Sequence, residues 1–222
     1  MSYKYELHCH CKENSPCGWM TAKETAERYR QAGYNGVVLT DHFRTDIIEK
    51  LSGTSWEEKV NFYWKPYKEL KAVYQGSDFF IGHGLEIRFD NNGNDILLYG
   101  FSDDLFLKEG ESWVKMGLPD FYKKYHDKML IIQAHPNRCA TTYQEPLAYL
   151  HGIEVKNASP RNENHNEISE QTVRENPWLI ATGGSDCHRK EDVAGSGIGC
   201  EKRIYTDKEL IKVLKSKAFN IL

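Results

Sequence analysis

Short apolar runs alternate with amphipathic segments along almost the whole chain. The apolar runs are rich in β-branched and aromatic residues, which favour buried strands. We expect strands at Tyr3–His8, Gly36–Thr40, Phe79–Ile87, Ile96–Phe101, Met129–Ala134, Gly152–Val155 and Leu179–Thr182. Strands that alternate with helices in this way are typical of an α/β fold with a mainly parallel sheet.

Apolar residues at helical spacing mark the segments between these strands. Thr21 and Glu24 form a capping box at the start of one helix, and Gly33 ends it. A second helical stripe runs from Tyr63 to Tyr74, with Pro66 either near its start or kinking it. Further helices are predicted at Phe121–His126, at Glu163–Arg174 and after the capping box Thr206–Glu209. We expect all of them to pack against the sheet.

Length and charge limit the classes of function. The 222 residues suit one α/β domain spanning 1–222. A net charge of -3 argues against binding to extended nucleic acid or to an anionic membrane, although a local basic pocket is compatible with it. The chain contains no apolar run long enough to cross a bilayer, and the first residues lack the apolar stretch of a signal peptide. We therefore expect a cytoplasmic protein.

The number of cysteines also indicates a reducing compartment such as the cytoplasm. Six cysteines are few for a disulfide scaffold of this length. Cys9 and Cys11 alternate with His8 and His10, and neighbouring side chains of a strand point to opposite faces. If the histidines face a site, the two cysteines face away from it. We interpret them as small buried thiols rather than as zinc ligands.

Histidines and carboxylates stand at or just beyond the ends of the predicted strands. In a barrel of parallel strands, all carboxyl ends open onto one face, where such enzymes keep their chemistry. Imidazoles and carboxylates that converge there can hold several divalent metal ions. The sequence therefore predicts a metal-dependent hydrolase whose candidate ligands are His8, His10, His42, Glu86, His135, Asp186 and His188.

Four arginines follow these segments and also belong to the predicted mouth. A guanidinium binds phosphate oxygens in a bidentate manner, which suits a doubly charged phosphomonoester. The candidate substrate-binding residues are Arg88, Arg138, Arg161 and Arg189.

Taken together, the motifs resemble the PHP (polymerase and histidinol phosphatase) family. They occur in that family's order between residues 8 and 188: His8-Cys9-His10, Gly36 to His42, Gly84-Leu85-Glu86, Ala134-His135-Pro136, Gly152 to Val155 and Gly184 to His188. The resemblance implies a distorted (βα)7 TIM-like barrel that binds two or three divalent metal ions, either zinc, manganese or iron.

The same resemblance assigns ligands to the first two metals. His8, His10, Glu86 and Asp186 would hold the first metal, with Glu86 bridging to the second. His135 would bind the second metal. The histidine that usually accompanies it is replaced by Asp95. His83 is an alternative, but it lies three residues before Glu86 within a strand and so faces the other side.

His42 and His188 resemble the ligands of the third metal. The family often adds a ligand five or six residues after His10, where this chain has Ser15 and Pro16. The loop offers Glu13 or Cys17 instead, and we prefer Glu13 because a carboxylate suits a hard metal. Asp41 is expected to orient a ligand rather than to bind metal itself.

The implied reaction is hydrolysis of a small phosphomonoester, as in histidinol phosphatase, by a water that the metals activate. Glu86 and Asp186 would hold the reacting metals, and His42, His188 or a second water would protonate the leaving group. The alternative on the same fold is a phosphodiesterase or exonuclease that acts on nucleotides or nucleic-acid ends. A metal-stabilised binding module without activity ranks third. The sequence does not indicate an oligomeric state.

Overall fold

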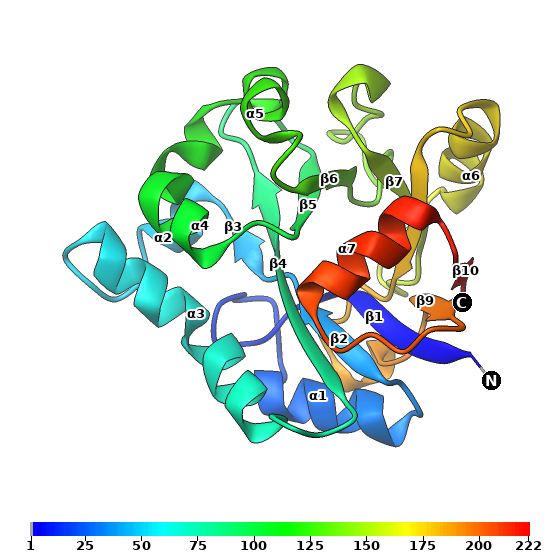
Figure 1. Ribbon diagram of the computed structural model, residues 1–222. Helices are drawn as coiled ribbons and strands as arrows, with labels where there is room; N and C mark the ends of the chain where they lie inside the picture. The colour runs from blue at the N-terminus through cyan, green and yellow to red at the C-terminus, as the bar shows by residue number, and fades with distance from the viewer. Residues whose placement is uncertain (1) are drawn as a thin grey trace.

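One curved sheet organises the computed structural model, which describes residues 2–222 (Figure 1). Its strands follow the order β10-β9-β1-β2-β4-β5-β6-β7-β8, and β3 pairs with β4. The strands are β1 (Tyr3–Cys9), β2 (Gly36–Leu39), β3 (His42–Phe43), β4 (Phe80–Arg88), β5 (Asp95–Tyr99), β6 (Leu130–Gln133), β7 (Gly152–Asn157), β8 (Ile180–Gly184), β9 (Ile198–Cys200) and β10 (Asn220–Ile221). Each predicted strand is present, with its ends displaced by at most two residues.

The sheet is almost closed into a barrel. A bridge between Cys9, the last residue of β1, and Cys187, just after β8, joins the two sides of the sheet. The amide of His10 donates to the carbonyl oxygen of Cys187 at 2.9 Å. The amide of Cys187 in turn donates to the carbonyl oxygen of His8 at 3.1 Å. The two ends of the sequence that carry the predicted ligands are therefore hydrogen-bonded to each other.

Strand directions correct part of the predicted fold. β1, β2 and β4 are parallel, as are β6, β7 and β8, but β5 runs antiparallel to both β4 and β6. A tight turn after β4 leads directly into β5, which leaves no room for a crossover helix. The regular (βα)7 alternation is thus interrupted, and the first residue of β5, Asp95, lies at the same end as the carboxyl ends of the parallel strands.

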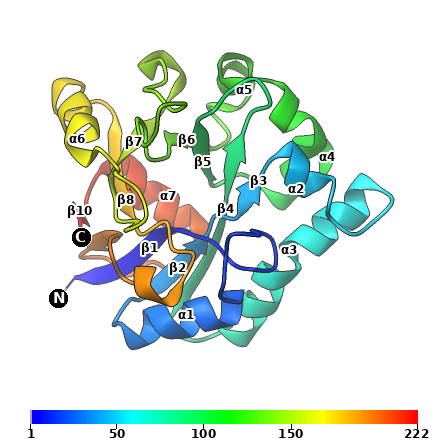
Figure 2. The same cartoon turned by 180° about the vertical axis from the view of Figure 1, so that it is seen from behind.

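Helices other than α7 cover the outer face of the sheet, as the view from behind shows (Figure 2). The helices of the chain are α1 (Ala22–Gln31), α2 (Thr45–Ile48), α3 (Trp56–Val73), α4 (Asp103–Glu109), α5 (Leu118–Tyr125), α6 (Asn166–Glu175) and α7 (Asp207–Ser216), with 3-10 turns η1 (Gly110–Lys115), η2 (Leu147–Tyr149) and η3 (Lys190–Asp192). Both predicted capping boxes, at Thr21 and at Thr206, are present. Pro66 lies in the interior of α3.

Two apolar clusters flank the sheet. The larger one lies between the strands and the outer helices and includes Trp113 and Phe106. The smaller one combines strand residues such as Tyr5 and Leu97 with Leu210 of α7. Because α7 contributes to this second cluster, it fills one end of the barrel, and the end formed by the strand carboxyl termini is left for polar side chains.

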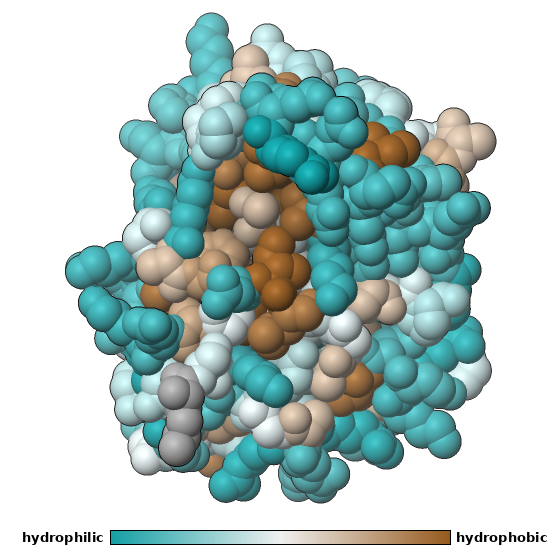
Figure 3. Space-filling view, turned by 90° about the vertical axis from the view of Figure 1, so that its right-hand side faces the viewer, coloured by the Kyte–Doolittle hydropathy of each residue, from teal (hydrophilic) through white to brown (hydrophobic). Residues whose placement is uncertain are grey.

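The side of the molecule that carries both chain ends is partly apolar. Figure 3 shows brown residues gathered in a hollow on that side, surrounded by hydrophilic residues. A groove of about 1140 Å³ is lined by residues of β9 and α7 and by Ser2, which precedes β1. It therefore lies near the start of β1, away from the strand carboxyl ends. None of the described helices is both long and apolar enough to span a membrane.

Candidate metal centre

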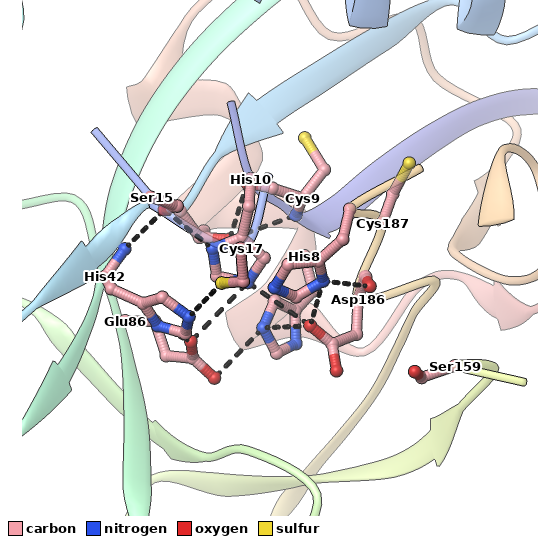
Figure 4. Close-up of polar contacts among 12 residues, drawn as sticks. His8, Cys9, His10, Ser15, Cys17, His42, Glu86, Ser159, Asp186 and Cys187 are labelled. Atoms are coloured by element: carbon pink, nitrogen blue, oxygen red, sulfur yellow. Dashed lines mark hydrogen bonds and ion pairs between the residues drawn. The ribbon is translucent and has the colours of Figure 1, made fainter. Parts of the chain in front are cut away.

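The predicted ligands meet at the open end of the barrel. A pocket of about 240 Å³ opens there and reaches His42, Glu86, His135, Asp186 and His188. His8 and His10 lie beneath it, and the close-up shows their rings converging with the two carboxylates (Figure 4). Segments separated by about 180 residues in the sequence are thus brought to one point.

The four proposed ligands of the first metal are in mutual contact. His8 Nε2 lies 3.1 Å from Glu86 Oε1 and 3.5 Å from Asp186 Oδ1. His10 Nε2 lies 3.5 Å from Glu86 Oε2 and 3.2 Å from Asp186 Oδ1. All four side chains are buried. Two imidazole nitrogens and two carboxylates therefore surround one small volume.

His135 and Asp95 stand next to this group. His135 Nε2 is 2.9 Å from Glu86 Oε1 and 3.9 Å from Asp95 Oδ2. Asp95 is thus inside the cluster, as the sequence indicated, although both of its oxygens also accept hydrogen bonds from Arg88, at 2.8 and 2.6 Å. The alternative residue, His83, lies on the outer face of the sheet against Trp64, so it takes no part in the site.

His42 and His188 complete the cluster on the side of His10. The His10 ring stacks on His188 at 4.2 Å between centroids and lies 4.4 Å from His42. One nitrogen from each of the three rings falls within 4.8 Å of the others. His42 Nδ1 is also 2.6 Å from Glu86 Oε2. The three histidines form a second group of candidate ligands that shares Glu86 with the first.

Glu13, the preferred additional ligand, makes its contacts elsewhere. Its carboxylate accepts hydrogen bonds from the amide of Ala22 at 3.2 Å, at the start of α1. Cys17 is the loop residue that reaches the site, with Sγ 3.2 Å from His42 Nε2. The helix start offers Glu13 an unpaired amide, and this outweighs its suitability for a metal.

The buried atoms of the cluster fit a metal better than they fit one another. His8 Nε2, His10 Nε2 and Glu86 Oε2 are buried and make no hydrogen bond of acceptable geometry, although oppositely charged atoms lie nearby. Buried polar atoms normally find a hydrogen-bond partner. Their short contacts with poor hydrogen-bond angles are the arrangement expected of ligands directed at a common ion.

The carboxylates set the protonation of the imidazoles. Burial disfavours a charge on His8, but Glu154, Asp186 and Glu86 outweigh it and hold the pKa of His8 well above its usual value. Burial likewise opposes the charge on Asp186, yet His8 and its neighbours keep the pKa of that carboxyl well below its usual range. For His10, burial and the adjacent His188 lower the pKa. Binding of metal would replace the protons on the charged imidazoles.

Cys17 carries an unusually acidic thiol. Burial would raise its pKa, but hydrogen bonds with His188 and His42 lower the pKa to about 6. The other cysteines near the site behave as predicted: Cys9 and Cys11 are buried in the outer cluster, and burial raises their pKa well above the usual value.

Residues that orient the ligands were only partly foreseen. Asp41 accepts a hydrogen bond from Ser15 Oγ at 2.8 Å, and Ser15 contacts His10 Nδ1 at 3.3 Å, in agreement with the orienting role predicted for Asp41. Glu154 contacts His8 Nδ1 at 2.9 Å, a role that the sequence did not indicate. Such partners fix the tautomer and direction of a ligating imidazole.

The backbone is unusual where ligands are held. A side chain at Gly184 would place its Cβ 2.4 Å from the Cβ of His8 and 2.7 Å from Glu154 Oε1, so glycine is required there. His135 and Asp186 adopt positive φ angles of 27° and 48°. Residues other than glycine rarely adopt this conformation, and it concentrates at functional sites.

All four predicted arginines line the pocket, together with Arg44. Three of the four are already paired: Arg88 with Asp95, Arg138 with Asp186 at 2.6 Å, and Arg161 with Asp192 at 2.5 Å. Arg189 instead lies over the ring of Trp19, 4.0 Å from its centroid. The pocket is therefore positively charged above a cluster of carboxylates.

Comparison with known proteins places this geometry in a fold group. The sequence matches no family model and no curated protein. Its structure matches a two-domain protein from Bacteroides vulgatus that contains a predicted PHP-like metal-dependent phosphoesterase, at a TM-score of 0.71 and 14% identity, over 100% of this chain and 65% of that one. The chain thus spans about two thirds of the length of that protein.

Two further structures share the fold. PsfC from Pseudomonas syringae PB-5123 matches at a TM-score of 0.67 and 14% identity, over 100% of this chain and 91% of that one. An amidohydrolase from Chromobacterium violaceum, solved with bound sulfate and no metal, matches at a TM-score of 0.50 and 16% identity, over 99% of this chain and 97% of that one. The PHP-like fold read from the motifs is confirmed, whereas identities this low leave the activity to be argued from the residues.

Proposed function

We propose that this chain is a PHP-type metal-dependent phosphoesterase that hydrolyses a small phosphomonoester at a site for two or three divalent metal ions. Histidinol phosphate is the first substrate to test. One observation carries the proposal: a set of buried ligands converges below a pocket lined by arginines. The proposed ligands are His8, His10, His42, Glu86, Asp95, His135, Asp186 and His188.

Glu86 has the contacts of a bridging ligand. Its Oε1 lies within 3.1 Å of His8 and 2.9 Å of His135, while its Oε2 lies 3.5 Å from His10 and 2.6 Å from His42. Each carboxylate oxygen of Glu86 therefore contacts a different pair of histidines. Divalent ions bound about 3.5–4 Å apart would supply an activated water and offset the charge that develops on the phosphoryl oxygens.

The arginines and the size of the pocket support a small anionic substrate. A volume of about 240 Å³ is below the roughly 300–1,000 Å³ of typical ligand pockets, so it suits a phosphoryl group with a short substituent better than a polymer. Arg138, Arg161 and Arg189 all line the pocket. A planar guanidinium can bind two phosphoryl oxygens at once.

Protonation of the leaving group is best assigned to the outer histidines. The side chains of His42 and His188 remain 11% and 12% exposed, whereas those of His8 and His10 are 0% exposed. Of these four histidines, only His42 and His188 line the pocket, so they are the pair that can approach the leaving oxygen of a bound ester when they do not hold a metal ion.

The test combines metal content with substrate class. Protein purified without chelators is analysed for metals and assayed against phosphomonoesters, including histidinol phosphate, beside phosphodiesters and short nucleic-acid ends. We expect two or three equivalents of metal and phosphate release from a monoester that stops on chelation. Asp186→Ala serves as the inactive control.

The other outcomes are equally informative. Cleavage of diesters without release from any monoester would replace this proposal with a nucleotide or nucleic-acid-end phosphodiesterase. At most one equivalent of metal, with no ester hydrolysed, would overturn the hydrolase assignment and favour a binding module.

A further inference from the structure

Cys17 directly follows Ser15 and Pro16, the two positions at which a further ligand was expected. It lies in the loop between β1 and α1, and its Sγ is 3.2 Å from His42 Nε2 (Figure 4). His188 lines the same pocket as Cys17. Cys17 lines the pocket and is exposed, unlike the buried Cys9 and Cys187.

His42 presents its Nε2 to the sulfur, and His188 lines the same pocket. His188 Nδ1 lies 2.8 Å from the backbone oxygen of Asp186, so it carries a proton and donates it there. His42 Nδ1 lies 2.6 Å from Glu86 Oε2. The hydrogen bond that His188 Nδ1 donates leaves the Nε2 lone pair of that ring free, which is how ligating histidines are commonly fixed. The contact of His42 Nδ1 with Glu86 lacks hydrogen-bond geometry.

The spacing agrees with a shared metal ion. Zinc binds imidazole nitrogen at about 2.0–2.1 Å and thiolate sulfur at about 2.3 Å, so tetrahedral geometry separates the two ligand atoms by about 3.5 Å. The observed 3.2 Å requires an adjustment of only a few tenths of an ångström. Behind these residues, His10 Nε2 is fully buried and makes no hydrogen bond.

The loop holds Cys17 in place by its own hydrogen bonds. The amide of Gly18 donates to Ser15 O at 2.8 Å, and the amide of Trp19 donates to His188 O at 2.8 Å. Gly18 packs so closely that a Cβ there would lie 2.9 Å from the backbone of Cys11. The thiol is therefore fixed beside His188 by main-chain contacts and is not the end of a loose surface loop.

We propose that Cys17 binds metal as a thiolate together with His42 and His188, so that the third metal position of this chain prefers thiophilic ions such as zinc, cobalt or cadmium over manganese or magnesium. The inference rests on the proposed function, because it concerns the same site. Three protein ligands leave a fourth position open. A thiolate supplies a soft ligand, and metal binding releases the thiol proton.

Cobalt provides a readout that does not depend on turnover. Metal-free wild-type protein, Cys17→Ser and the control Cys139→Ser, which removes the other exposed cysteine, are titrated with Co(II). We expect a cobalt–thiolate charge-transfer band in the near ultraviolet for the wild type and for Cys139→Ser, and its loss in Cys17→Ser. Zinc should also slow alkylation of Cys17 in the wild type at least tenfold, as followed by mass spectrometry.

A second variant separates a ligand role from a structural one. Cys17→Asp restores a hard ligand, so we expect the ratio of zinc to manganese affinity at this position to fall at least tenfold while circular dichroism is unchanged. An equally strong band in Cys17→Ser, or no band in fully loaded wild type, would overturn the proposal. These results are independent of ester hydrolysis, so a failure here is distinct from failure of the phosphoesterase assignment.

Discussion

Oε1 of Glu154 lies 2.9 Å from Nδ1 of His8 and fixes the direction in which that imidazole points. The other oxygen of Glu154 accepts a hydrogen bond from the amide of His135 at 3.1 Å and one from Asn157 at 2.9 Å. One buried carboxylate therefore positions ligands from two strands. It does so from β7, which contributes no ligand of its own to the proposed set.

Replacing Glu154 with glutamine should weaken metal binding. The amide can still contact His8, but it lacks the negative charge that supports the ligating tautomer. Loss of such a partner typically lowers metal affinity by about 10–100-fold. Competition with a coloured chelator measures the change, and Glu170→Gln, an exposed position on α6, is the control. Equal affinities for wild type and Glu154→Gln would exclude the positioning role.

Asp186→Ala should abolish phosphate release, whereas Glu13→Ala should not. Asp186 contacts both His8 and His10, so its removal takes a ligand from the first metal. We expect a loss larger than the ~10–100-fold cost of an orienting partner. Glu13 contacts the start of α1 instead and should change turnover by less than about twofold. Turnover is measured at saturating metal, and near-normal activity of Asp186→Ala would contradict the proposed site.

Arg189→Ala should raise the KM for a phosphomonoester and leave kcat nearly unchanged. Within residues 2–222, Arg189 has no ion pair with a carboxylate and lies over Trp19, so its guanidinium is available to substrate. A hydrogen bond to a charged group contributes about 1.5–3 kcal/mol, which corresponds to a KM increase of roughly tenfold or more. Steady-state kinetics with Lys190→Ala, its exposed neighbour, as control provide the test. A fall in kcat alone would place Arg189 in the chemical step.

The stability of the metal-free protein should fall as pH rises through about 7 because of Glu6. Burial raises the pKa of this carboxyl to about 7, against 4.5 for an exposed glutamate. The folded protein therefore binds the proton more tightly than the unfolded chain does. The resulting stabilisation is complete below about pH 4.5 and is lost through pH 7, with a ceiling of about 3 kcal/mol.

Glu6→Gln tests this dependence. An amide can keep the hydrogen bonds of Glu6 with the amide of His8 and with Ser185, but it does not titrate. The free energy of unfolding is measured with denaturant between pH 5 and 8 for both metal-free proteins. We expect the wild type to lose stability relative to Glu6→Gln over this range, and parallel pH profiles would refute the assignment.

The sequence predicted the strands and helices and most residues of the cluster, because both leave local signals. Apolar runs located each longer strand, and Glu86 and His135 follow from their place at strand ends. The direction of β5 could not be predicted, since alternation of apolar residues is the same in parallel and antiparallel strands. Asp95 was nevertheless identified from its place in the order of motifs.

Loop geometry and buried acids were harder to predict. Glu13 and Cys17 lie in one loop, and only its hydrogen bonds decide which side chain reaches His42. Glu154 and Glu6 stand within strands among apolar residues, where a sequence pattern does not reveal their partners. The arginines were located correctly, but their pairing with Asp95, Asp186 and Asp192 depends on tertiary contacts.

The bridge that joins the edge of β1 to the segment after β8 determines when the site can exist. His8 and His10 are among the first residues of the sequence, and Asp186 is separated from them by nearly all of the other strands. Contacts this distant in sequence form late, because the intervening chain must be ordered first. A chain still emerging from the ribosome therefore lacks two of the eight proposed ligands, Asp186 and His188, until those residues are made. We therefore expect metal binding at the proposed site only in a molecule whose barrel has closed.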